Sequence, residues 1–124
     1  MNSKIRALII DGSYTNRILL KALLEDFDFE VTEACNTLKA LQMLDNAKPN
    51  IILLELSEPF KNGYDFLDSI GLYLKGIPVI VISVYDDQQI IREAYKRGAS
   101  EYFIKPIDTQ KLAIKLSHYV ECVI

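Results

Sequence analysis

The sequence has few of the residues that build metal centres, redox sites and membrane segments. Its two cysteines, Cys35 and Cys122, lie far apart and form no CxxC motif, which favours reduced thiols in a cytoplasmic protein over a disulfide or a zinc site. The single histidine, His118, is more typical of a solvated or core-edge position than of a metal ligand. No apolar run approaches the ~18 residues that span a bilayer, and residues 1–4 lead directly into a predicted strand, so neither a membrane segment nor a signal peptide is expected.

The composition is that of an ordinary globular protein. The 124 residues are 50% hydrophobic and 25% charged and contain no low-complexity stretch, which predicts one domain over residues 1–124. The formal net charge of −3 argues against direct binding to nucleic acid or to an anionic membrane.

The chain is organised around an apolar run, residues 51–55, that ends in a carboxylate. Four consecutive large aliphatic residues precede Glu55, and such a short continuous run is typical of a strand buried on both faces. Buried strands of this kind occur in parallel sheets that helices cover on both sides. Glu55 then lies at the carboxyl end of the strand, where ligands gather in open parallel sheets.

Four further strands alternate with helical segments along the chain. The five predicted strands are residues 5–10, 29–32, 51–55, 79–82 and 102–104. Predicted helix caps are Ser13 or Thr15, Asn36 or Thr37, Asp86, and Asp108 or Thr109, with Gly98 closing the fourth helix. The expected inward faces include Ile18, Leu19 and Leu23 in the first helix, Leu38, Leu41 and Leu44 with Ala40 beside them in the second, and Leu112, Leu116 and Tyr119 in the last.

This alternation predicts an α/β fold, a five-stranded parallel sheet with helices on both faces and right-handed crossovers. All strands then point the same way, so residues that follow their carboxyl ends share one edge of the sheet. Asp11, Glu55, Ser83 and Lys105 follow the first, third, fourth and fifth strands. Topology alone therefore predicts that these four residues converge.

The chain resembles the receiver domain of two-component response regulators over essentially its full length. The stretches that carry the resemblance are residues 8–17, 49–55, 59–63, 77–83 and 102–106. It implies the doubly wound (βα)5, flavodoxin-like (CheY-like) fold with strand order 2-1-3-4-5. It also implies a signalling role, because receivers accept a phosphoryl group from a histidine kinase onto an aspartate with the help of Mg²⁺. Phosphorylation then changes a surface used for dimerisation or partner binding.

The residues that carry this chemistry in the family are only partly present. Asp11 stands at the first acidic position, but Gly12 replaces the second acid, and Glu55 stands where the phosphorylated aspartate is expected. Ser83 and Lys105 match the residues that bind the phosphoryl oxygens.

Three other positions follow from the same resemblance. Tyr102 matches the aromatic residue that changes rotamer in switching members, and Val84 replaces a smaller residue, which predicts narrower access to the site. The family usually has a cis bond at the position of Lys105–Pro106.

These substitutions weaken the expected phosphoryl-transfer chemistry. Mg²⁺ requires tight octahedral geometry and carboxylate ligands, and with Gly12 at the second position Asp11 is the main surviving candidate, so Mg²⁺ binding is expected to be weak or absent. Glu58, three residues after Glu55, is an alternative ligand, although a solvated loop charge is favoured. Glu55 is also one methylene longer than aspartate, roughly 1.5 Å, while a displacement of ~1 Å can already cost about a hundredfold in rate.

Two roles for Glu55 stay open. Its carboxylate could reach Lys105 and Ser83 and partially mimic a phosphoryl group, or it could pair with Lys105 alone and fix one inactive-like shape.

The favoured function is an atypical receiver that is not an enzyme and acts as a protein–protein interaction module. Its expected partners are signalling proteins, a histidine kinase or an output domain, bound through the face of the fourth helix, fifth strand and fifth helix. That face would include Ile91, Tyr95, Tyr102 and parts of residues 111–115, and homodimerisation stays open. One alternative is a working phosphoacceptor of unusual chemistry. Another is a doubly wound domain that binds a small ligand at the same edge, which the missing Gly-rich phosphate loop disfavours.

Overall fold

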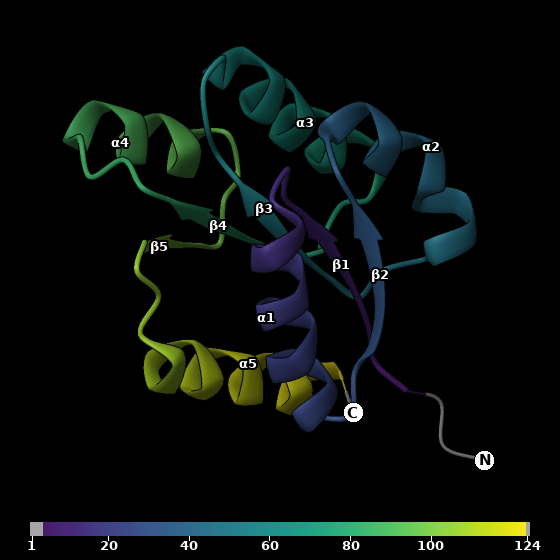
Figure 1. Ribbon diagram of the computed structural model, residues 1–124. Helices are drawn as coiled ribbons and strands as arrows, with labels where there is room; N and C mark the ends of the chain where they lie inside the picture. Colours follow the sequence, from purple (N-terminus) through teal and green to yellow (C-terminus); the bar gives the residue numbers. More distant parts are fainter. Residues whose placement is uncertain (1–3, 124) are drawn as a thin grey trace.

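The computed structural model describes the backbone of residues 4–123 and the side chains of residues 4–121. Strands and helices alternate strictly along the chain (Figure 1). The strands are β1 Arg6–Ile10, β2 Glu30–Ala34, β3 Ile51–Glu55, β4 Val79–Ser83 and β5 Glu101–Ile104. The helices are α1 Tyr14–Asp26, α2 Thr37–Ala47, α3 Phe60–Tyr73, α4 Gln88–Lys96 and α5 Thr109–Val123.

The five strands form one parallel sheet in the order β2-β1-β3-β4-β5, which confirms the predicted fold and strand order. β3 lies at the centre of the sheet, and Leu53 pairs with Ile9 of β1 on one side and with Ile80 of β4 on the other. The four aliphatic residues of β3 are all buried, as expected for a strand covered on both faces.

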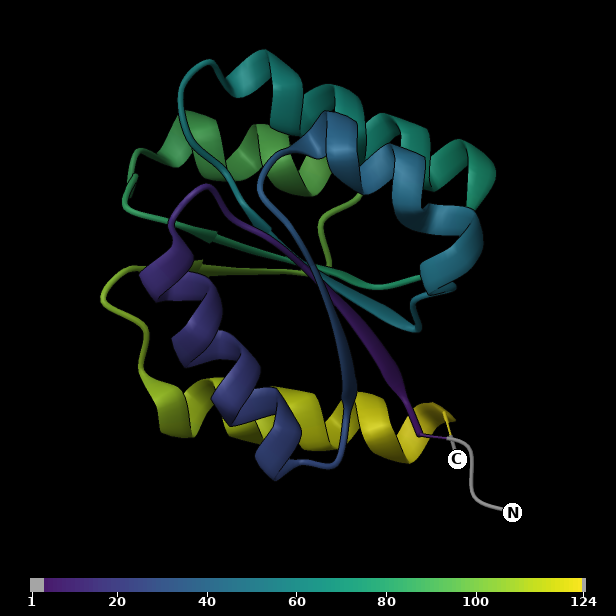
Figure 2. The same cartoon turned by 45° about the vertical axis from the view of Figure 1, so that its right-hand side comes forward.

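Helices cover both faces of the sheet: α2, α3 and α4 lie on one side and α1 and α5 on the other (Figures 1 and 2). Alternate residues of each strand point to opposite faces. Leu8 and Ile10 of β1 therefore pack in the core under α2, α3 and α4, while Ile9 packs with Leu24 of α1 and Leu116 of α5. No helix among the described residues is long and apolar enough to cross a membrane.

The predicted inward faces are correct for α5 and only partly correct for α1 and α2. Leu112 and Leu116 are fully buried, whereas Leu19 and Leu38 are 65% and 64% exposed, and Ile18 and Leu41 also lie on exposed faces. The buried residues of α1 are Leu20 and Leu24, which were not predicted, while Ala40 of α2 is buried as predicted and Leu23 and Leu44 pack against the core. Adjacent residues of a helix point about 100° apart, so an error of one residue in the predicted face changes which leucine is buried.

The predicted N-terminal caps of α1, α2 and α5 are confirmed. Ser13 Oγ accepts the Asn16 amide, Asn36 Oδ1 accepts the Lys39 amide, and Asp108 Oδ1 accepts two amides of α5. The expectation of Asp86 at α4 is wrong by one position, because Asp87 accepts the Gln89 amide. Gly98 follows the helix at φ 110°, the left-handed conformation that glycine favours there.

Two further expectations concern peptide bonds and thiols. The Lys105–Pro106 bond is cis, as predicted, and Glu58–Pro59, which the sequence did not single out, is cis too. Cys35 is a free, exposed thiol. The prediction for Cys122 lies outside the described side chains.

Candidate functional site

The carboxyl ends of β1, β3 and β5 bring three charged side chains together, as the topology predicts. Lys105 Nζ lies 2.6 Å from Glu55 Oε2 and 3.5 Å from Asp11 Oδ2. Glu55 Oε1 also accepts the Gly12 amide at 3.4 Å. The lysine thus bridges the two carboxylates, and two negative charges against one positive charge leave the cluster at −1.

Asp11 is the most deeply buried charged residue of this cluster, with 2% of its surface exposed. Its Oδ1 atom accepts the Ser13 amide at 2.8 Å, but the buried Oδ2 atom has no hydrogen-bond partner. Burial raises the pKa of Asp11, and the nearby Glu55 carboxylate raises it further, against the lowering effect of the Ser13 amide and Lys105.

For Glu55, the effects that lower the pKa outweigh those that raise it. Burial alone would raise the pKa of Glu55, but the hydrogen bond and charge of Lys105, together with the Gly12 amide, lower it below its ordinary value. We therefore expect Glu55 to stay ionised near neutral pH and to hold the ammonium group of Lys105.

Replacing Asp11 with asparagine is expected to stabilise the fold at pH 7 by about 1–3 kcal/mol, because a buried, unpartnered carboxylate oxygen becomes an amide that can donate to Glu55. The folded-state pKa of Asp11 is raised, so the contribution of this residue to stability is fully present below its ordinary value of 3.8 and is lost as pH rises through the folded value. The advantage of Asp11→Asn should therefore shrink as pH falls through the raised folded pKa and be smallest below 3.8. Urea unfolding across pH checks this, with exposed Asp45→Asn as control; an unchanged or lower stability at pH 7 contradicts it.

Ser83 comes to the same edge of the sheet but is turned into the protein. Its Oγ atom donates to the carbonyl of Leu56 at 2.7 Å and accepts the Tyr85 amide at 3.1 Å. Ser83 is fully buried, so its hydroxyl is already engaged away from Glu55 in this conformation.

No pattern in the sequence indicates the role of Tyr85. Tyr102 donates its hydroxyl to the Tyr85 carbonyl at 2.7 Å, and the ring of Tyr85 meets Phe60 edge-on with centroids 4.9 Å apart. The Tyr85 hydroxyl donates to Glu58 Oε1 at 3.3 Å. Tyr85 thus links Ser83, Tyr102 and the connection before α3, and only tertiary contacts reveal this.

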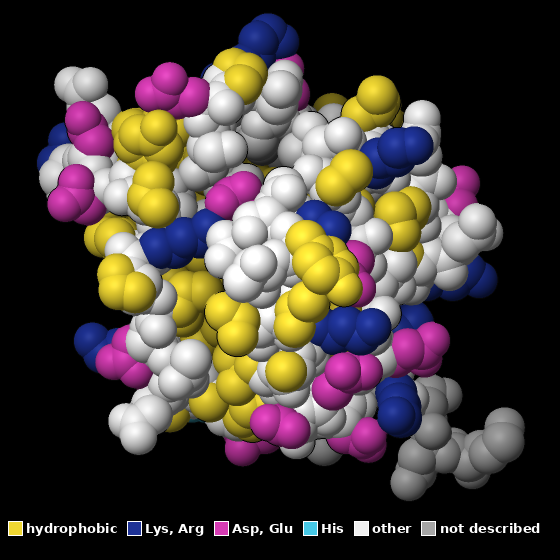
Figure 3. All heavy atoms as spheres, viewed as in Figure 1, with side chains coloured by type: hydrophobic (Ala, Val, Ile, Leu, Met, Phe, Trp, Pro, Cys, Tyr) yellow, Lys and Arg dark blue, Asp and Glu magenta, His cyan; other side chains and the backbone are white. Residues whose placement is uncertain are grey.

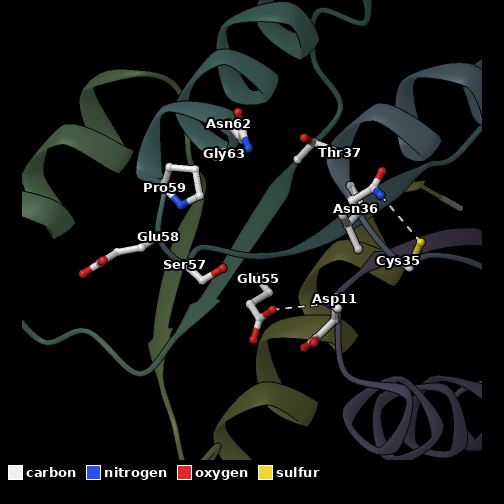
Figure 4. A pocket seen from close by; sticks show the side chains of 12 residues that line it. Asp11, Cys35, Asn36, Thr37, Glu55, Ser57, Glu58, Pro59, Asn62 and Gly63 are labelled. Atoms are coloured by element: carbon white, nitrogen blue, oxygen red, sulfur yellow. Dashed lines mark hydrogen bonds between the residues drawn. The ribbon is translucent and has the colours of Figure 1, made fainter.

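A cavity of about 150 Å³ opens beside Glu55 and Asp11 (Figure 4). Its other walls come from residues 57–63 and from the β2–α2 connection, including Cys35 and Asn36, which no sequence pattern places at the site. Figure 4 shows the Glu58 carboxylate turned away from Asp11, which supports a loop charge over a replacement ligand. Among the described residues, no group of three or more His, Cys, Asp or Glu side chains is placed to hold a metal ion.

Val84 and Gly12 are the two positions where a difference from the family was expected to change the space at the site. Val84 is 62% exposed and lines a second cavity together with Asp11 and Lys105, whereas it does not line the cavity beside Glu55, so its expected narrowing of access to the site stays a prediction. A Cβ atom added at Gly12 would come no nearer than 3.7 Å to the Cys35 carbonyl oxygen, an ordinary contact. The backbone at Gly12 therefore does not itself exclude a residue with a Cβ atom, as the family's second acid would have.

A five-stranded parallel sheet with an acidic pair and a lysine at its carboxyl edge defines the class of receiver domains. The family model of the response regulator receiver domain matches residues 7–117, and the chain belongs to this family, which serves two-component signalling.

Individual relatives match along most of their own length. The chain is 30% identical to sporulation initiation phosphotransferase F of Bacillus subtilis, over 97% of this chain and 95% of the relative. It is 31% identical to the chemotaxis protein CheY of Listeria monocytogenes, over 87% and 92%. A solved two-component response regulator from Clostridium difficile superposes with a TM-score of 0.88 at 25% identity, over 95% of this chain and 97% of that one.

Proposed function

We propose that this receiver domain works without phosphorylation in the usual way and acts as a protein–protein interaction module rather than an enzyme. The observation that carries the proposal is the 2.6 Å contact between Lys105 Nζ and Glu55 Oε2 at the phosphoacceptor position. In phosphoryl transfer a nucleophile must face the incoming phosphorus while a cation neutralises the developing charge. Here a longer carboxylate is already held by the lysine that would bind the phosphoryl oxygens.

The donor set fits the Mg²⁺ of the family poorly. Only Asp11 and Glu55 offer carboxylates, and the Lys105 ammonium group lies within 3.5 Å of both. Gly12 adds a backbone amide, which donates to Glu55, where the family has a second acid. A divalent cation would have to enter beside a positive charge with fewer carboxylates than it prefers, so we propose weak or absent Mg²⁺ binding.

Of the two roles for Glu55, the contacts favour a fixed shape over mimicry of the phosphorylated state. Mimicry requires the negative group to engage both Lys105 and Ser83, and the Ser83 hydroxyl is instead bonded to the Leu56 carbonyl. Tyr102 is held by the Tyr85 carbonyl. The proposed role is therefore a single conformation that Glu55 and Lys105 stabilise.

The proposed partner-binding surface is the face of α4, β5 and α5. Apolar side chains on it are exposed without a partner in the fold: Tyr95, Ile104 and Ile114 are 45%, 44% and 57% exposed. Lysines also lie on α5, and one of them, Lys115, pairs with Glu101 at 3.1 Å. Exposed apolar side chains together with charged ones on these elements suit the binding of a signalling protein, a kinase or output domain, in the cytoplasm.

Amide NMR spectra recorded during addition of Mg²⁺ and then beryllofluoride, an acyl-phosphate mimic, test the proposal. We expect the amides of Asp11, Ser83 and Tyr102 to stay unshifted, because no aspartate stands at the acceptor position and the metal ligands are incomplete. A receiver with the complete acidic set serves as the positive control. Saturable shifts that spread to α4, or a mass gain of one phosphoryl group with acetyl phosphate, would show a working phosphoacceptor and overturn the proposal.

A further inference from the structure

A second cavity, larger than the one beside Glu55, lies between α1 and the connection from β5 to α5. Its volume is about 550 Å³, against about 150 Å³ for the cavity beside Glu55, and sites for small molecules in proteins commonly span about 300–1,000 Å³. Its apolar lining includes Leu19, Leu20 and Leu23 of α1, together with Ile107 and Leu112. Figure 3 shows hydrophobic side chains gathered along this part of the surface. The dimensions and lining suit a small apolar molecule.

The inner end of this cavity is polar and contains a carboxylate whose Oδ2 atom has no hydrogen bond and only a 3.5 Å contact to Lys105 Nζ. Asp11 and Lys105 both line it, and the Asp11 side chain is 1% exposed with no hydrogen-bond partner at Oδ2. Figure 4 shows the Asp11 carboxylate turned toward the side of α1 and α5, away from Asn36 and Thr37. A buried acceptor without a donor is rare and costly, so a ligand that donates to this atom would gain a strong hydrogen bond.

Charge decides which donor fits best. Lys105 makes its shorter contact to Glu55, 2.6 Å against 3.5 Å to Asp11, which leaves the Asp11 oxygen only partly neutralised. An ammonium group at Asp11 Oδ2 would complete an alternating series of Glu55, Lys105, Asp11 and ligand, with no net charge. A carboxylate would face two like charges, and an alcohol would donate without adding the missing positive charge.

We propose that this cavity binds a small apolar primary amine, with its hydrocarbon part between α1 and α5 and its ammonium group on Asp11. Binding is reversible, and the ligand differs from any phosphoryl donor or metal. The inference rests on the proposed function in one respect, because an unmodified Glu55 must hold Lys105. The cavity itself is separate from the one beside Cys35 and Asn36, since the two share only Asp11 among their lining residues.

A matched ligand series tests the proposal on the wild-type domain. Phenethylamine, phenethyl alcohol and phenylacetate share the ring and chain and differ in the polar group. We expect phenethylamine to raise the melting temperature and to shift amides of α1 and of residues 107–112 saturably, and the other two to bind at least about tenfold more weakly. Asp11→Asn should weaken amine binding about tenfold or more, while Asp45→Asn, an exposed acid of α2, should leave it unchanged.

Four results would overturn the assignment. Equal binding of all three compounds would mean that the cavity selects only for apolar surface. Shifts confined to the cavity of Cys35 and Asn36 would place the ligand elsewhere. Stabilisation by Mg²⁺ alone to the same extent would make Asp11 a metal ligand instead, and no binding of the amine at millimolar concentration would remove the site altogether.

Discussion

Replacing Lys105 with methionine is expected to lower the free energy of unfolding at pH 7 by about 3 kcal/mol, because it leaves two largely buried carboxylates without their counter-charge. The Lys105 and Glu55 side chains are only 17% and 22% exposed, and that of Asp11 is 1% exposed. Methionine keeps most of the hydrocarbon volume of lysine, so the loss should reflect charge rather than a cavity. Urea unfolding with a common m-value measures it.

The domain offers a matched control for this substitution. Lys61 Nζ lies 2.6 Å from Asp65 Oδ2, the same distance as in the Lys105–Glu55 pair, but these side chains are 81% and 52% exposed. Solvent screens such a pair, so Lys61→Met should cost less than about 1 kcal/mol. Equal losses for the two variants would contradict the idea that burial makes the Lys105 cluster important.

The pH dependence gives an independent check on the same cluster. The folded-state pKa of Glu55 is lowered, so its contribution to stability is present above its ordinary value of 4.5 and is lost as pH falls through the folded value. In Lys105→Met the main cause of that lowering is gone. The gap between wild type and Lys105→Met should therefore be widest near neutral pH and narrow in acid, and a gap independent of pH would point to packing instead.

The fold could be predicted because short stretches of adjacent residues determine its strands. The continuous apolar runs of β3 and β4 and the polar residues that follow them determine buried strands and their exposed ends. Parallel topology then brings Asp11, Glu55 and Lys105 together without further assumptions. In the structure, Lys105 Nζ lies within 3.5 Å of a carboxylate oxygen of each of the two acids.

The buried faces of α1 and α2 and the hydrogen bonds of Ser83 could not be fully predicted from the sequence, because they depend on the directions of side chains. The spacing of leucines in α1 and α2 allows more than one apolar face, and packing against the sheet selects Leu24 and Ala40 over Leu19 and Leu38. The Ser83 hydroxyl can rotate toward the site or toward the Leu56 carbonyl, and the choice depends on the Tyr85 amide beside it. Hydrogen-bond partners of this kind follow from the assembled loops and leave no periodic signal in the chain.

Restoring two acids should restore the chemistry of the family if Gly12 and Glu55 are what silences the site. The double variant Gly12→Asp/Glu55→Asp has three carboxylates around Lys105 and a shorter side chain at the acceptor position. A Cβ at Gly12 meets only the Cys35 carbonyl oxygen at 3.7 Å, so the first side-chain atom of the added aspartate needs no displacement of the backbone. We expect saturable Mg²⁺ binding and a rate of phosphorylation by acetyl phosphate at least about a hundredfold above wild type.

The variant Gly12→Asn/Glu55→Asp separates charge from shape in this experiment. It has nearly the same side-chain volume at position 12 but one carboxylate fewer, so its Mg²⁺ affinity and phosphorylation rate should stay well below those of the double aspartate variant. Without metal, the double aspartate variant should be less stable than wild type because like charges crowd one lysine, and Mg²⁺ at about 100 times its dissociation constant should return about 2.7 kcal/mol. If neither Mg²⁺ binding nor phosphorylation appears, the block lies elsewhere, and the Ser83 hydroxyl bound to Leu56 and the Tyr102 hydroxyl bound to Tyr85 are the contacts to release next.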